Sequence, residues 1–195
     1  MMKNLKLQAV QKWFVLSLII LLGTASCNQA QEKSTKEAKI EAPSTTIQEA
    51  AFFGNVEAIK GHIAAKTDLN QKDAYGSTPL HIAATFGKTE VALLLIEGGA
   101  NLNEKSADGS TPLHTAAFFG RTEIVKALLK HKVDVTIRNA YNSTALESVS
   151  APFDDVKPIY DQMSKTLGPF GLKLDYDQLK TNRPIIAEMI KAQSN

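Results

Sequence analysis

The sequence repeats itself at an interval of 33 residues through its middle. The hexapeptide Gly-Ser-Thr-Pro-Leu-His occurs at residues 76–81 and again at 109–114, and a pair of alanines stands shortly after each copy. The same interval separates Gly54, Gly87 and Gly120. A period of this length predicts an array of similar units, each of which buries its apolar face only by stacking on its neighbours.

Each unit carries the start and stop signals of two helices. Thr78 is a good N-cap, and Pro79 follows at the first helical position, where its missing N–H costs nothing. Gly87 ends this helix. Apolar side chains within 91–95 predict a second, antiparallel helix, after which the chain forms a hairpin that turns at Gly109. The sequence therefore predicts an all-α solenoid of helix-turn-helix-hairpin units.

These units resemble ankyrin repeats. The resemblance is carried by the Thr-Pro-Leu-His motifs, by the alanine pairs and by the glycine that ends each first helix. It covers residues 45–150 and implies about four repeats, of which those at 73–105 and 106–138 are well formed. It also implies the usual role of the family, which is to bind another protein.

The outer repeats keep the register through different residues. Thr45 with Gln48, and Thr144 with Glu147, have the spacing of a capping box, in which each side chain bonds to the backbone N–H of the other residue. We therefore expect first helices to start at four equivalent threonines, namely Thr45, Thr78, Thr111 and Thr144.

The repeat pattern is lost after residue 150. We interpret residues 151–195 as a helical C-terminal cap, because the last unit of a solenoid must cover the exposed end of the core. Pro158 should interrupt the helix that follows the fourth repeat start. Within the cap we expect a helix around 156–167, a turn at 168–171 and a last helix led by Pro184.

The N-terminus has the organisation of a secretory signal over residues 1–26. Lys3, Lys6 and Lys12 precede an apolar run at 13–22, which is followed by small residues. A helix of that run would rise only about 15 Å. This is roughly half of the hydrocarbon thickness of a bilayer, so we do not expect a transmembrane span.

Residues 22–27 resemble a bacterial lipobox, in which the cysteine is acylated, although Thr24 stands where leucine is usual. The resemblance implies lipid attachment at Cys27, and it makes residues 27–44, which are largely polar, a flexible tether. The alternative is ordinary signal cleavage that leaves a free thiol. With the repeats, the lipobox resembles exported bacterial ankyrin repeat lipoproteins. We therefore expect the chain in the cell envelope, anchored to a membrane and facing either the periplasm or the cell surface.

The charge balance argues against nucleic acid as a partner. The chain has 22 basic and 20 acidic residues, and three of its lysines lie in the signal segment, which has no acidic residue. Without that segment 19 basic residues remain, and the formal net charge becomes −1. Binding to phosphates needs a surplus of clustered cations.

The residues that could suggest catalysis or metal binding are better explained by a role in holding the fold together. His81 and His114 stand one repeat apart, about 8–10 Å, which is too far for both to ligate one metal. The family resemblance implies instead that each bonds to the backbone of the neighbouring hairpin. The sequence has no Gly-x-Ser-x-Gly elbow and no phosphate-binding loop. We expect no enzymatic activity, no metal and no cofactor.

Aromatic residues recur just before the turn glycines. In ankyrin proteins these positions face the concave groove beside the hairpin tips, so we expect a row of exposed phenylalanines there; the alternative is that the rings stack on one another between helices. The expected protein-binding residues are Phe52, Phe53, Tyr75, Ser77, Thr85, Phe86, Asp108, Ser110, Phe118, Phe119 and Tyr141.

The sequence thus predicts a monomeric module that binds a partner protein on its concave surface. Two alternatives stay open. One is an enzyme or small-ligand-binding protein that uses Tyr160, Tyr176 or Arg183 of residues 151–195. The other is an envelope spacer without a specific partner.

Overall fold

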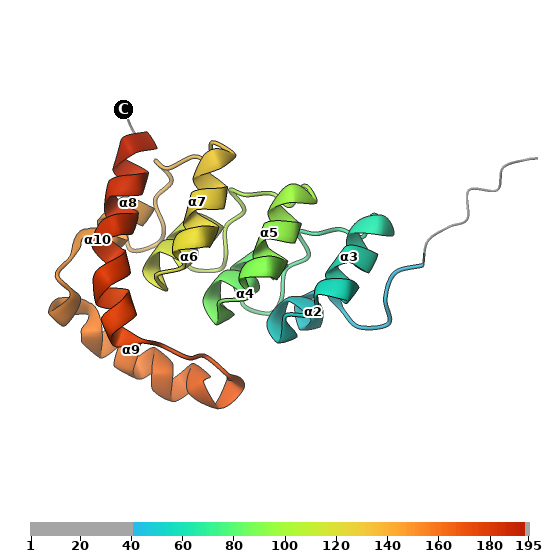
Figure 1. The fold of residues 1–195 in the computed structure, drawn as a ribbon, viewed down its shortest axis with the longest axis horizontal. Coiled ribbons are helices and arrows are strands. Elements are labelled where there is room, and N and C mark those ends of the chain that lie inside the picture. Colours follow the sequence, from blue (N-terminus) through green and yellow to red (C-terminus); the bar gives the residue numbers. More distant parts are fainter. Residues whose placement is uncertain (1–40, 194–195) are drawn as a thin grey trace, which may run out of the picture. The chain divides into compact units, whose positions relative to one another are not determined.

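The computed structural model describes residues 41–193, and the regular elements in this range are all helices. The predicted all-α solenoid is confirmed. The expected signal segment, Cys27 and the tether up to residue 40 lie outside the described residues. The first three helix pairs are α2 (Ile47–Phe53) with α3 (Val56–Ala64), α4 (Pro79–Phe86) with α5 (Thr89–Glu97), and α6 (Pro112–Phe118) with α7 (Thr122–Lys130). They stand side by side and are joined by hairpins (Figure 1).

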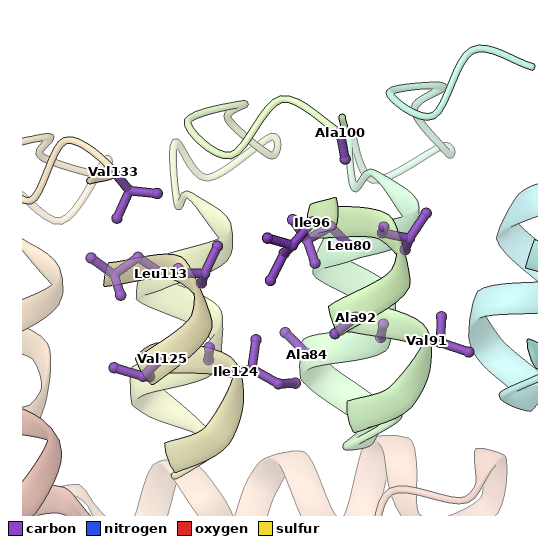
Figure 2. Packing of buried hydrophobic residues seen from close by; sticks show 14 of the residues in the cluster. Leu80, Ala84, Val91, Ala92, Ile96, Ala100, Leu113, Ile124, Val125 and Val133 are labelled. Carbon is purple, nitrogen blue, oxygen red and sulfur yellow. The ribbon is translucent and has the colours of Figure 1, made fainter. Parts of the chain in front are cut away.

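The core lies between these pairs and comes from the residues that repeat. Leu80 and Leu113 of the inner helices belong to one buried apolar cluster with side chains of α5 and α7, among them Val91 and Ile124 (Figure 2). The alanine pairs, such as Ala83 and Ala84, are completely buried. Because their side chains are small, successive inner helices can approach closely.

Capping boxes start the inner helices, with one difference from the expected positions. The structure confirms the helix starts at Thr78, Thr111 and Thr144 and the predicted box of Thr144 with Glu147; at Thr78 and Thr111 it adds boxes completed by His81 and His114. The first helix instead takes Thr46 as its N-cap, so the expected start at Thr45 was wrong by one residue. The reason is that the carboxylate of Glu49 accepts the Thr46 N–H at 2.9 Å, and an anion is favoured at a helix N-terminus.

The C-terminal segment completes a fourth helix pair. The inner helix is α8 (Ala145–Ser150), and α10 (Tyr176–Gln193) packs against α8, α7 and α6. Ile186 and Ile190 of α10 are buried in the same core as the repeats. In Figure 1, α10 lies beside α7 as the next outer helix. The helix α9 (Phe153–Leu167) and the 3₁₀ turn η1 (Gly168–Phe170) are therefore an insertion between the two helices of repeat four.

Both prolines of this segment lie inside helices. The structure contradicts an interruption at Pro158, since α9 runs from Phe153 to Leu167, and Pro184 lies within α10 instead of leading it. A proline in a helix interior costs roughly 3 kcal/mol. In α10 this cost is offset by packing on both sides of the proline, where Leu179 and Ile186 are buried.

Candidate protein-binding surface

The hairpin tips present Tyr75, Asp108 and Tyr141 at one repeated position. Both tyrosines are largely exposed, at 78% for Tyr75 and 76% for Tyr141. The two tyrosine tips are each held by an acceptor at the base of the hairpin: Asp73 Oδ1 accepts the N–H groups of Tyr75 and Ser77, both at 2.8 Å. Asn139 accepts the corresponding pair in the third hairpin at 3.1 Å. The exposed rings therefore stand on ordered turns.

Neighbouring hairpins are joined through their backbones. The Ala107 N–H donates to the Tyr75 carbonyl at 3.1 Å, and the Ala140 N–H donates to the Asp108 carbonyl at 2.8 Å. Gly76 allows this close approach, because a Cβ at that residue would lie 2.8 Å from the Ala107 nitrogen, and its φ of +68° favours glycine. The tips thus form one connected row across three hairpins.

Asp108 is the anion of this row. Burial raises the pKa of its carboxyl, but hydrogen bonds from the Ser106 hydroxyl and from the Ser110 N–H and hydroxyl outweigh burial and bring the pKa below its ordinary value. At neutral pH the row therefore carries a fixed negative charge between two tyrosines.

The two motif histidines hold successive repeats together. His81 Nε2 donates to the Ser110 carbonyl at 2.9 Å, and His114 Nε2 donates to the Ser143 carbonyl at 3.0 Å. This confirms the bond to the neighbouring hairpin that the family resemblance implied. Within residues 41–193, His, Cys, Asp and Glu side chains form no group of three or more that could hold a metal ion.

These histidines should make stability depend on pH. Burial lowers the pKa of both imidazoles, and this outweighs the opposite effect of the bonds to the carbonyls of Ser110 and Ser143. In the unfolded chain histidine titrates near about 6.5. Below that pH the unfolded state binds more protons than the native state, so stability falls with falling pH until the lower native pKa values are reached.

We therefore expect a lower melting temperature at pH 5.5 than at pH 7.5, measured by circular dichroism. A double variant, His81→Asn with His114→Asn, should lose most of this difference. An equally large difference in the double variant would mean that other groups cause it.

The aromatic residues do not form one continuous exposed row. Phe52 packs edge-to-face on Phe86, with ring centroids 4.6 Å apart. Phe118 instead packs on Tyr160 of the inserted α9, also at 4.6 Å, and Phe119 is only 6% exposed. The expectation of exposed rings is therefore wrong for Phe119, and Phe118 is only half-exposed. The reason is that the C-terminal segment covers this end of the array.

The remaining expected contact residues stay partly or fully accessible. Phe53 is 73% exposed, whereas Phe52, Thr85 and Phe86 are half-buried. Ser77 and Ser110 are half-buried at the bases of their hairpins. Among the expected contact residues, the accessible ones thus lie on the hairpin tips and at the inner-helix ends of the first two repeats.

The three tail residues named for the alternative function serve the cap. Arg183 is buried and donates to the Tyr160 hydroxyl at 2.8 Å and to the Ala151 carbonyl at 2.9 Å. The Tyr160 hydroxyl in turn donates to the Phe118 carbonyl at 2.5 Å, at the end of α6. Tyr176 donates to Asp161 at 2.8 Å. Arg183 and Tyr160 thus satisfy backbone carbonyls at helix ends, and Tyr176 bonds to a side chain of α9, roles that no sequence pattern indicated.

One crevice lies near the tail, between the turn of repeat three and the start of α10. Its volume is about 290 Å³, close to the lower limit for small-ligand pockets. Phe119, Arg121, Leu174 and Gln178 are among its lining residues, whereas Tyr160, Tyr176 and Arg183 are not. The crevice therefore does not bring together the residues named for a tail site.

Stacked helix pairs joined by hairpins define the class of helical repeat solenoids. Residues 47–139 match a family model described as ankyrin repeats (3 copies). The chain is thus an ankyrin repeat protein over this stretch, and such domains generally serve as protein–protein interaction modules. A search of curated proteins gave no match. In the described part of the chain, no helix has both the length and the apolar character needed to cross a membrane.

Proposed function

We propose that this protein docks a partner protein on its hairpin tips and on the adjoining inner-helix ends of the first two repeats. The observation that carries the proposal is the exposure of Tyr75 and Tyr141 on turns that are fixed by Asp73 and Asn139. Large aromatic side chains that lose little conformational freedom on binding are typical of interface hot spots.

The surroundings of the tyrosines suit a specific interface. Asp108 stands as a carboxylate at the tip of the hairpin between them, and polar residues such as Ser77 and Asn142 flank the tyrosines in the sequence. A polar rim excludes water from the aromatic contacts and fixes the orientation of the partner. Binding in this mode needs neither a cofactor nor a catalytic group.

The proposal places this interaction in the bacterial cell envelope, with the monomeric chain anchored to a membrane through a lipid on Cys27. Its support is the lipobox-like sequence and the polar stretch that separates Cys27 from the first repeat. An anchored module raises the local concentration of its partner at the membrane, so a moderate affinity is sufficient.

The test is affinity capture with the full chain from membranes of the cells that produce it. A double variant, Tyr75→Ala with Tyr141→Ala, should recover the partner at a level reduced by about tenfold or more, since each hot-spot residue contributes more than about 1 kcal/mol. The measurement is quantitative mass spectrometry of the captured proteins.

The control is Phe170→Ala, which removes an exposed aromatic ring from the turn after α9, outside the hairpins and the inner helices. This variant should recover the partner as well as the wild type. Equal recovery by the double variant would exclude the hairpin tips as the docking surface. Absence of any enriched protein would favour an envelope spacer.

A further inference from the structure

The helix α9 contributes nothing to the core that joins the repeats. Of its 15 residues only Tyr160 is buried, and none of them belongs to the apolar cluster shared by the repeats and α10. By contrast, Ile186 and Ile190 of α10 lie in that cluster. In Figure 1, α9 runs along the lower edge of the fold, across the direction of the stacked helices. It is therefore attached to the array from outside.

α9 also contains a proline whose cost is not offset by core packing. Pro158 has no N–H with which to bond the carbonyl of Asp154, and a proline inside a helix is unfavourable. The ion pair of Lys157 with Asp161, at 2.9 Å, joins two partly exposed side chains of α9 itself and adds little stability. Few buried contacts and an internal proline give α9 a much lower local stability than the helices of the core.

A small set of contacts holds α9 in place. The Tyr160 ring lies on Phe118, and its hydroxyl donates to the Phe118 carbonyl and accepts from Arg183. Near the other end of the helix, Tyr176 of α10 donates to Asp161 at 2.8 Å. If α9 moves away, water reaches the groups on both sides of these bonds, so no buried polar group is left without a partner.

The chain is anchored on both sides of α9. Before it, Arg183 donates to the Ala151 carbonyl at 2.9 Å. After it, the turn η1 is followed by Gly171, whose φ is +97°, and apart from the adjacent residues no atom lies within 4 Å of where its Cβ would be. The next residue, Leu172, is buried. Residues 153–171 can thus move about a free turn while the chain on either side stays in place.

We propose that residues 153–171 form a latch, which opens as one local unit while the repeats and α10 stay folded. In the closed state the latch covers the Phe118 ring at the end of α6. Opening makes this ring accessible and extends the exposed inner-helix ends from the first two repeats into the third. The inference goes beyond the proposed function, because the opening is a property of the chain alone.

The test is hydrogen–deuterium exchange of the full chain, followed by mass spectrometry of its peptides. The amides of α9 should be protected about a hundredfold less than the slowest amides of α10. Tyr160→Phe should raise the exchange of α9 by about tenfold, because the closed state loses the bonds of the hydroxyl, one of them to a guanidinium. The matched control is Tyr141→Phe, which changes an exposed tyrosine of a hairpin and should leave α9 unaffected.

Leu113→Ala separates local opening from global unfolding. This variant weakens the shared core, so the slowest amides of α10 should exchange about a hundredfold faster, whereas the exchange of α9 should stay the same. Low concentrations of urea give the same comparison on the wild type: they should accelerate α10 far more than α9, because a local opening exposes little surface. Equal protection of α9 and α10, or parallel acceleration in either measurement, would show one cooperative unit and would overturn the inference.

Discussion

Replacing Arg183 with leucine is expected to lower the free energy of unfolding by about 3 kcal/mol. The side chain is 2% exposed, and its guanidinium donates to the carbonyls of Ser148 and Ala151 and to the Tyr160 hydroxyl. Leucine fills part of the space but donates no hydrogen bond, so polar groups at the end of α8 lose their partner. The melting temperature should fall by roughly 10 °C.

The matched control for this prediction is Lys180→Leu, which removes an exposed cation from the same helix. Its melting temperature, followed by circular dichroism, should stay close to that of the wild type. If Arg183→Leu behaved like this control, the polar contacts of the cap would contribute little to stability, and α10 would be held by its apolar face alone.

Leu113→Ala is expected to have the largest effect, a loss of about 3–4 kcal/mol in the free energy of unfolding. Leu113 is buried in the core of the third repeat, between helices whose positions are fixed on both sides by neighbouring repeats, so the cavity cannot close easily. Urea denaturation measures this loss.

The matched control is Leu93→Ala, which removes the same side chain from a partly exposed position, since Leu93 of α5 is 37% exposed. Its loss should stay below about 1 kcal/mol. Equal losses for the two variants would contradict the assignment of Leu113 to the shared core.

The repeated part of the fold could be predicted because its signals are local. Threonine caps, prolines at the first helical position and turn glycines each act within one or two helical turns, and the 33-residue interval then places the units in register. Even there the predicted start of α2 was wrong by one residue. Thr45 with Gln48 and Thr46 with Glu49 both fit the capping box, and only the folded chain shows that the carboxylate is used.

The C-terminal segment could not be predicted in the same detail because its contacts join residues far apart in the sequence. Arg183 contacts Tyr160, and Tyr160 contacts Phe118, so neither partner is set by local spacing. The same contacts explain why the aromatic row ends at the third repeat. Sequence periodicity indicated equivalent positions, but it could not show that the chain itself covers one of them.

The affinity of the purified partner for the full chain tests the central claim most directly. Measured by isothermal titration calorimetry against the wild type and against the Tyr75→Ala, Tyr141→Ala double variant, the dissociation constant should rise by about tenfold or more in the double variant. The heat of unfolding of the two proteins should meanwhile stay the same. An unchanged dissociation constant would show that the partner binds elsewhere and would contradict the docking surface assigned to the hairpin tips.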